Sequence, residues 1–280
     1  MKLDYSIGQV APYINWIYFF HAWGTNGMTP QEKSKLQAEA EERLQRYADR
    51  YQTHGLFQLF EAYAEEDDIV VRGEEQEVGG ERIPCLRQQQ QGSEYLCLAD
   101  FISPQVTLSA SHQSSLTSKI GVFATTVDMG LEIDFSADPY EKMMMQLLAD
   151  RLAEATAEYM HQEVRRHYWG YAPDEQLTIQ DLLNERWQGI RPAVGYPSLP
   201  DVSLNFVIDR LICMGQIGIR LTEHGAMKPH ASVSGLMMAC PKAHYFSVGR
   251  IDEEQLADYA RRRGLPVELA RRFLTSNLGE

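Results

Sequence analysis

The sequence has 280 residues, of which 44% are hydrophobic and 23% charged, the composition of an ordinary globular protein that can bury a sizeable core. Its formal charge of −13 repels phosphate backbones and anionic membrane surfaces, so we expect neither nucleic-acid binding nor membrane binding. The sequence contains neither an apolar run of about eighteen residues nor an apolar signal-peptide region, so we expect a cytoplasmic protein.

The four cysteines lie far apart along the chain, without a C-x-x-C pair. A zinc cluster or a disulfide scaffold is therefore not indicated, and we expect reduced thiols. The chain also has no internal repeat and no obvious linker, so we expect one domain over residues 1–280. Its parts in chain order are expected to be an N-terminal helical segment (1–54), a sheet with a long helix (55–170), and a ligand loop with the C-terminal part (171–280).

The first third of the chain predicts helices and then strands. Residues 13–23 are dense in aromatic side chains and predict a short buried element packed on the main body. Residues 30–51 predict an amphipathic helix, because Leu36 and Leu44 are spaced for one face. The pattern then changes to runs typical of strands, with no long helix between the first ones, which favours an antiparallel sheet. These runs are residues 56–63, 68–71, 82–86 and 120–124.

Asp138 and Pro139 predict the start of the longest helix, because Asp caps a first turn and Pro has a suitable φ there. We expect this helix to end near Tyr168. Its apolar face is predicted to consist of Met143, Met144, Leu147, Leu148, Leu152, Ala155 and Tyr159. The elements expected after it are helices over 178–187 and 201–214, a strand over 217–221, a paired hairpin of 233–239 with 245–251, and two helices within 252–274.

Asp150, Glu154, Glu158 and His161 fall on one stripe of the long helix. The Glu158-x-x-His161 spacing occurs in di-metal helical bundles, where several such helices converge. Only one helix of this chain carries it. We therefore expect a solvated or ion-paired face here rather than a metal site.

Residues 185–200 predict a fixed, extended loop, because three prolines restrict its backbone and Gly195 can adopt a φ that other residues resist. The loop carries Arg191, whose guanidinium can bind a small carboxylate ligand through two parallel hydrogen bonds. The alternative interpretation is an ordinary connection in which Arg191 pairs with a neighbouring side chain.

The run Arg-Pro-Ala-Val-Gly-Tyr-Pro at 191–197 closely resembles the Arg-Pro-Ala-Pro-Gly-Tyr-Pro signature of the activation domain of cobalamin-dependent methionine synthase. The resemblance extends over nearly the whole chain. It implies an α+β fold, with a bent antiparallel sheet surrounded by helices, and the binding of S-adenosylmethionine. Segments that match in the same order are 13–16, 19–20, 97–101, 149–155, 168–173, 221–223, 231–235 and 258–279.

The same resemblance implies how the ligand is held. Arg191 is expected to bind its carboxylate and Asn15 its α-amine. Glu154 and Glu185 match acidic residues near the sulfonium, where a negative charge stabilises the cation in a partly desolvated cleft.

The resemblance also assigns the remaining contacts of the nucleoside. The backbone of Ala193, Gly195 and Tyr196 is expected to suit the adenine end, and Tyr245 with Phe246 matches a tyrosine-led contact pair of the family. No catalytic residue and no metal ligand are expected.

Several positions depart from the family pattern. Asn15 stands where the family usually has Asp, and a neutral acceptor makes a weaker hydrogen bond to an amine. Val202 stands where the family usually has His. Residues 228–230 and 236–237 replace a Trp-Pro-Gly and an aromatic pair, which implies a differently shaped surface toward cobalamin.

The resemblance implies a function in reactivation, in which the domain presents S-adenosylmethionine to oxidised cobalamin and a flavoprotein supplies an electron for reductive methylation. The sequence has no zinc-thiolate homocysteine site and no Asp-x-His-x-x-Gly cobalamin loop, so we do not expect activity of the chain alone. We expect a stand-alone activation subunit that serves a separate cobalamin-bearing methionine synthase, with a flavodoxin-like electron donor. The alternatives are a sensor of S-adenosylmethionine and a non-catalytic assembly partner of a corrinoid methyltransferase.

Overall fold

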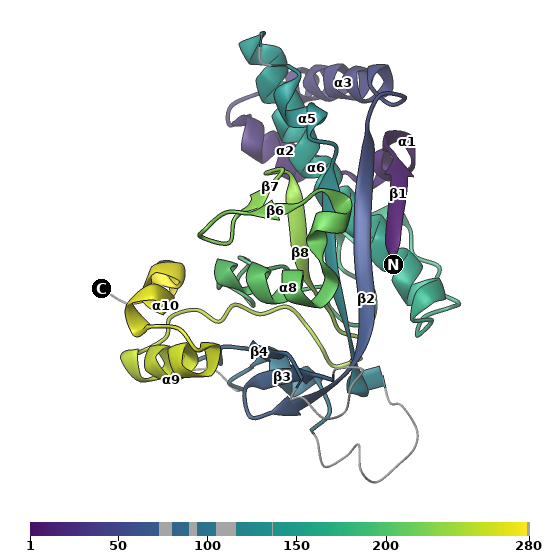
Figure 1. Ribbon diagram of the computed structural model, residues 1–280. Helices are drawn as coiled ribbons and strands as arrows, with labels where there is room; N and C mark the ends of the chain where they lie inside the picture. Colours follow the sequence, from purple (N-terminus) through teal and green to yellow (C-terminus); the bar gives the residue numbers. More distant parts are fainter. Residues whose placement is uncertain (73–79, 90–93, 105–115, 136, 279–280) are drawn as a thin grey trace.

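A computed structural model describes residues 1–72, 80–89, 94–104, 116–135 and 137–278 (Figure 1). A six-stranded antiparallel sheet forms its centre, as predicted. The long strand β2 pairs with β5 along one edge, and with β1 and then β3 along the other. The strands are β1 (Lys2–Ser6), β2 (Gln52–Glu65), β3 (Asp68–Val71), β4 (Arg82–Pro84), β5 (Lys119–Val127) and β8 (Ser232–Met237).

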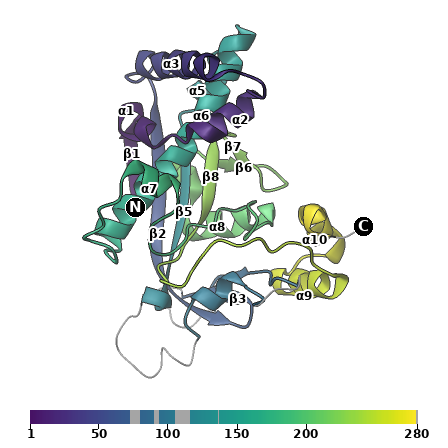
Figure 2. The ribbon, with the colours of Figure 1, turned by 180° about the vertical axis from the view of Figure 1, so that it is seen from behind.

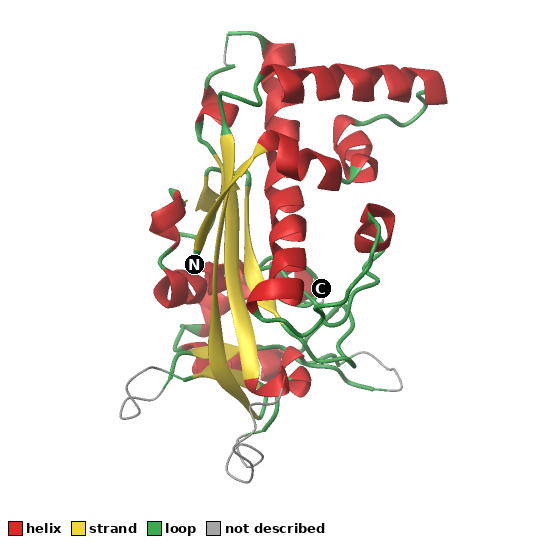
Figure 3. Ribbon diagram, turned by 90° about the vertical axis from the view of Figure 1, so that its right-hand side faces the viewer, coloured by secondary structure: helices red, strands yellow, loops and turns green. Residues whose placement is uncertain are grey.

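The helix α6 (Pro139–Glu163) runs along one face of the sheet and continues into a π-helical turn, Val164–Tyr168 (Figure 3). The predicted start is confirmed, because the Asp138 side chain accepts hydrogen bonds from the first backbone N–H groups of α6. One residue of the predicted apolar face is wrong. Met143 is 44% exposed, whereas Met145, two residues later, is buried in the core.

Three helices before β2 pack against α6: α1 (Ile7–Val10), α2 (Trp16–Trp23) and α3 (Pro30–Arg46). The expectation that residues 13–23 are buried is only partly confirmed. Phe19 is fully buried, but Ile17 and Tyr18 are 76% and 61% exposed. A short amphipathic helix on the surface buries only one face. The high aromatic content of this segment therefore predicted more burial than the structure has.

The opposite face of the sheet is covered by α8 (Asn205–Ile212). Strand β5 is therefore buried on both faces, with Phe123 packed toward α6 and Val122 toward α8. The two predicted tail helices, α9 (Glu253–Arg263) and α10 (Val267–Phe273), are confirmed and lie far from α3 (Figure 2). The remaining elements include α5 (Gly130–Ile133), α7 (Ile179–Leu183), β6 (Arg220–Leu221) and β7 (Met227–Lys228).

The predicted hairpin of 233–239 with 245–251 is wrong. Strand β8 pairs with β5 on one side, and its other edge is taken by residues 190–194. Val194 N–H donates to Ser234 O at 2.9 Å, and Leu236 N–H donates to Pro192 O at 3.0 Å. The approach requires glycine at position 235, because a Cβ there would lie 2.2 Å from Pro192 O. Residues 241–250 have no regular secondary structure.

None of the helices within the described ranges is long and apolar enough to cross a membrane.

Candidate ligand-binding site

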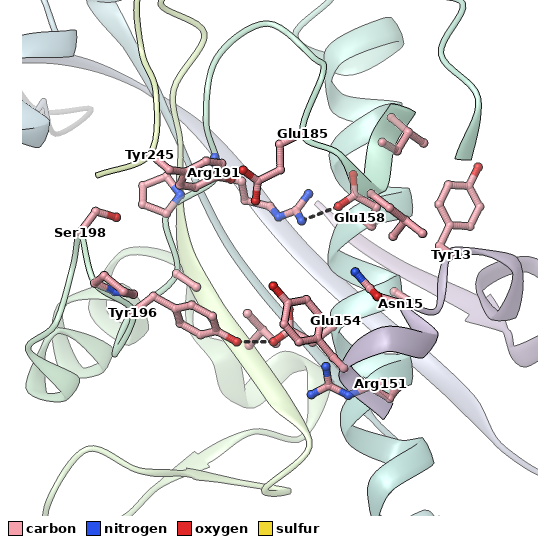
Figure 4. Close-up of a pocket in the computed structure, with 18 of the residues that line it drawn as sticks. Tyr13, Asn15, Arg151, Glu154, Glu158, Glu185, Arg191, Tyr196, Ser198 and Tyr245 are labelled. Carbon is pink, nitrogen blue, oxygen red and sulfur yellow. Dashed lines mark hydrogen bonds and ion pairs between the residues drawn. The ribbon is translucent and has the colours of Figure 1, made fainter. Parts of the chain in front are cut away.

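A cavity of about 760 Å³ lies between α6, the start of α2, the loop around Arg191 and residues 245–247 (Figure 4). Its volume is within the range of about 300–1,000 Å³ that is typical of small-molecule sites. Of the nine site residues predicted from the sequence, all but Gly195 line this cavity. Those lining it are Asn15, Glu154, Glu185, Arg191, Ala193, Tyr196, Tyr245 and Phe246.

Two tight turns fix the loop that follows Arg191. Tyr196 N–H donates to Ala193 O at 3.2 Å in the first turn, and Leu199 N–H donates to Tyr196 O at 2.9 Å in the second. In addition, Gly195 N–H donates to Leu199 O at 2.8 Å. Gly195 has a φ of +88°, a conformation that glycine adopts without strain. The backbone donors of Gly195 and Tyr196 are therefore engaged within the loop, and the Ala193 carbonyl retains capacity for a second hydrogen bond.

Arg191 is held on several sides. One Nη donates to Glu158 Oε2 at 2.8 Å, the other lies 3.1 Å from His161 Nδ1, and its backbone N–H donates to Tyr245 Oη at 2.9 Å. Burial, the largest single influence, lowers the pKa of the Arg191 guanidinium, but Glu158, Tyr245 and Glu154 together outweigh it and the net shift is upward. Arg191 therefore both pairs with a neighbour and lines the cavity, so the two interpretations of this loop are compatible.

His161 supports Arg191 as a neutral acceptor. Its Nδ1 faces two guanidinium groups, Arg191 at 3.1 Å and Arg165 at 2.8 Å. Guanidinium groups only donate, so Nδ1 carries no proton, and the proton of the neutral ring is on Nε2, 3.4 Å from Tyr171 Oη. Burial and the two arginines hold the pKa of His161 well below its ordinary value.

Half of the stripe on α6 is thus buried. Glu158 and His161 are 7% and 0% exposed, so a solvated face is wrong for these two residues and an ion-paired face is confirmed for Glu158. The described residues include no cluster of three or more His, Cys, Asp or Glu side chains suited to a metal ion.

The other carboxylates of the cavity are in different environments. Glu154 accepts a hydrogen bond from the Tyr196 hydroxyl. Glu185 has a positive φ of 56°, and partial burial raises the pKa of its carboxyl. Two carboxylates thus lie beside one cavity that also contains the Arg191 cation, as Figure 4 shows.

Asn15 lies at the cavity as the N-cap of α2. Its Oδ1 accepts a hydrogen bond from Ile17 N–H at 3.1 Å. A carbonyl oxygen has two lone pairs, so this bond leaves room for a second donor. The cap explains why the position carries Asn, since Asn and Asp are both preferred there.

Several further residues line the cavity that the sequence did not predict. Glu158 is the most prominent of them, because its carboxylate contacts Arg191 directly. A signal for it was present, since Glu158 follows Glu154 by four residues and therefore lies on the same helix face. The others include Tyr13, Tyr18, Arg151, Trp187 and Ser198.

Comparison with known proteins identifies the family. A family model described as the vitamin B12 dependent methionine synthase activation domain matches residues 6–264. A crystal structure of the MetH reactivation domain bound to AdoHcy superposes with a TM-score of 0.89 at 36% sequence identity, and the match covers 100% of this chain and 90% of that one. The chain therefore belongs to the activation domain family of vitamin B12-dependent methionine synthase.

Proposed function

We propose that this chain binds S-adenosylmethionine in the cavity and supports the reductive methylation of a cobalamin held outside these 280 residues. The observation that carries the proposal is the position of Arg191, a cation with a 12% exposed side chain in the wall of a cavity that Glu154 and Glu185 also line. The related reactivation domain binds AdoHcy, the ligand that remains when S-adenosylmethionine has given up its methyl group.

The cavity offers partners for each charged part of this ligand. Arg191 suits the carboxylate, because charge-assisted bonds from a guanidinium to a carboxylate are among the strongest in proteins. Glu154 and Glu185 suit the sulfonium, which gains Coulombic stabilisation beside a carboxylate in a partly desolvated site. Loss of positive charge from the sulfonium as the methyl group leaves would weaken that attraction and favour release of the product.

The work of this chain in the proposed reaction is to position its ligand. Bound cobalamin would supply the metal that accepts the methyl group, and a flavodoxin-like donor would supply the electron. The residues of this chain hold the nucleoside, orient its sulfonium and exclude water, and none of them forms a covalent bond with it. Acting in trans as a separate subunit, the chain would need an interface of about 1,000 Å² or more with a cobalamin-bearing methionine synthase.

The test is a reconstitution in trans. The chain is mixed with S-adenosylmethionine, a reduced flavodoxin-like donor and a partner loaded with oxidised cobalamin, and the visible spectrum of methylcobalamin is followed. We expect methylcobalamin to form only when this chain is present. Equal formation without it would refute the proposal. Ligand binding without methylation would instead indicate a sensor, and no ligand binding would indicate an assembly partner.

A further inference from the structure

We propose that Glu158 binds the α-ammonium group of the ligand, so that Arg191 and Glu158 together recognise its amino-acid end as a zwitterion. The inference rests on the proposed function, because it requires a nucleoside with an amino-acid end in this cavity. It adds an ionised acceptor to a site whose expected acceptor, Asn15, is neutral.

The first observation is an unsatisfied carboxylate oxygen. Glu158 Oε2 accepts from Arg191 at 2.8 Å, while the buried Oε1 has no hydrogen-bond partner among the residues that the structure describes. The Glu158 side chain is only 9% exposed. A buried acceptor without a partner costs free energy, and an ammonium group with three N–H donors would remove that cost.

The second observation is the contact between Glu158 and Arg191. The carboxylate and the ammonium of an α-amino acid are attached to the same carbon, so their binding partners must be neighbours of opposite charge. Arg191 and Glu158 are such neighbours, and both line the cavity. A carboxylate placed on Arg191 brings the adjoining ammonium within reach of Glu158.

The other acceptors of the cavity are less suited to this part of the ligand. Asn15 is uncharged, and its Oδ1 already accepts from Ile17 N–H. Glu154 accepts from the Tyr196 hydroxyl, away from Arg191 in Figure 4. Glu185 lies near Arg191, but its residue is exposed and its carboxyl only partly buried, and no hydrogen bond joins it to Arg191 among the described residues.

His161 allows the pair to bind a ligand without losing its arrangement. Its neutral Nδ1 accepts from one Nη of Arg191, whereas Glu158 accepts from the other, so this bond does not depend on the ligand. Arg191 therefore keeps its position while Glu158 turns its free oxygen toward an ammonium group.

The experiment is calorimetric titration of the wild-type chain and of Glu158→Gln with three ligands. These are AdoHcy, its deaminated analogue, which keeps the carboxylate, and its decarboxylated analogue, which keeps the amine. We expect Glu158→Gln to weaken binding of AdoHcy and of the decarboxylated analogue by about tenfold each, since a charge-assisted bond is replaced by a neutral one. Binding of the deaminated analogue should be unchanged or tighter.

The matched control is Glu141→Gln, which breaks another partly buried pair on α6, between Glu141 and Arg43 at 2.8 Å. It should leave the affinity for all three ligands unchanged. If Glu158→Gln does not fold, Glu158→Asp, which withdraws the carboxylate by one methylene group, should give the same pattern.

Two results would overturn the inference while leaving the proposed function intact. One is an unchanged affinity of Glu158→Gln for AdoHcy. The other is an equal loss for AdoHcy and for the deaminated analogue, which would show that Glu158 only orients Arg191. If the wild-type chain binds none of the three ligands, the proposed function itself is wrong and the inference falls with it.

Discussion

Two arginine–glutamate pairs flank the same histidine. They differ in how many carboxylate oxygens of the glutamate are hydrogen-bonded. Arg165 and Arg191 both donate to His161 Nδ1, and both guanidinium groups lie over the Trp187 ring, at 5.0 and 5.5 Å from its centroid. Arg165 contacts both oxygens of Glu175, at 2.9 and 2.7 Å. Arg191 contacts one oxygen of Glu158 and leaves the other without a partner among the described residues.

The difference indicates what each pair can do. The Arg165–Glu175 pair is buried, with side-chain exposures of 0% and 6%, and both of its carboxylate oxygens are satisfied, so it can only hold the chain together. The Arg191–Glu158 pair lies in the wall of a cavity with unused hydrogen-bonding capacity. We call these the closed pair and the open pair.

The largest expected effect comes from breaking the closed pair. Arg165→Ala should lower the free energy of unfolding by about 3–5 kcal/mol, because it leaves the Glu175 carboxylate buried and unpaired. Denaturant titration measures this loss. Arg186→Ala, which removes a mostly exposed ion pair with Asp181, is the control and should change stability little. Equal effects of the two substitutions would contradict the closed pair's structural role.

Breaking the open pair should affect binding more than stability. Arg191→Ala should weaken S-adenosylmethionine binding by about 2 kcal/mol or more, roughly thirtyfold, because it removes the charged partner of the ligand carboxylate. Its unfolding free energy should fall less than that of Arg165→Ala. Calorimetric titration measures the affinity, and an unchanged value would show that the carboxylate binds elsewhere.

The histidine between the pairs predicts a pH dependence of stability. His161 has a lowered pKa in the folded chain, so in acid the unfolded chain takes up a proton that the folded chain does not. The contribution of neutral His161 to the free energy of unfolding should be complete above the ordinary histidine pKa of about 6.5. It should fall by up to about 1.4 kcal/mol per pH unit as the pH drops from there toward the pKa of His161 in the folded chain.

The variant His161→Gln isolates this contribution, because its amide oxygen can accept from both arginines but does not titrate. Its unfolding free energy, measured by denaturant titration from pH 7.5 to 5, should depend less steeply on pH than that of the wild-type chain. Parallel curves would exclude His161 as the group responsible.

The smallest expected effect comes from a substitution that adds a negative charge near the open pair. Asn15→Asp should tighten S-adenosylmethionine binding several-fold, because an ionised acceptor replaces a neutral one near the ligand ammonium. Asp caps a helix about as well as Asn, so the melting temperature should not change. Calorimetry in low and high salt measures the gain, which should shrink as salt screens it. Unchanged or weaker binding would place Asn15 away from the amine.

Local sequence signals predicted most of the elements. Asp138 marked the start of α6, and runs of residues typical of strands marked the sheet. The prediction of a hairpin between residues 233–239 and 245–251 was wrong, because a strand pattern does not show which segment pairs with the strand. The edge of β8 is occupied by the loop at 190–194, which has no strand pattern of its own since Pro192 interrupts it.

Site residues within or linked to a sequence motif could be predicted. A residue whose role depends on burial in the folded chain was harder to predict. The run at 191–197 led to Arg191 and, through the family resemblance, to the residues that line the cavity with it. Glu158 was visible only as one member of a helical stripe. Spacing places a carboxylate on a helix face, but it does not show that one oxygen is buried and unpaired; that depends on the packing of α6 against the ligand loop.

The pairing of the ligand loop with β8 has a consequence for self-association. Strand β8 is the last strand of the sheet order, and residues 190–194 occupy its outer edge through backbone hydrogen bonds. If this loop detached, the outer edge of β8 would be unpaired, and a strand of another chain could hydrogen-bond to it. A ligand that binds the loop therefore also keeps that edge closed, and concentrated protein should remain monodisperse longer with the nucleoside than without it.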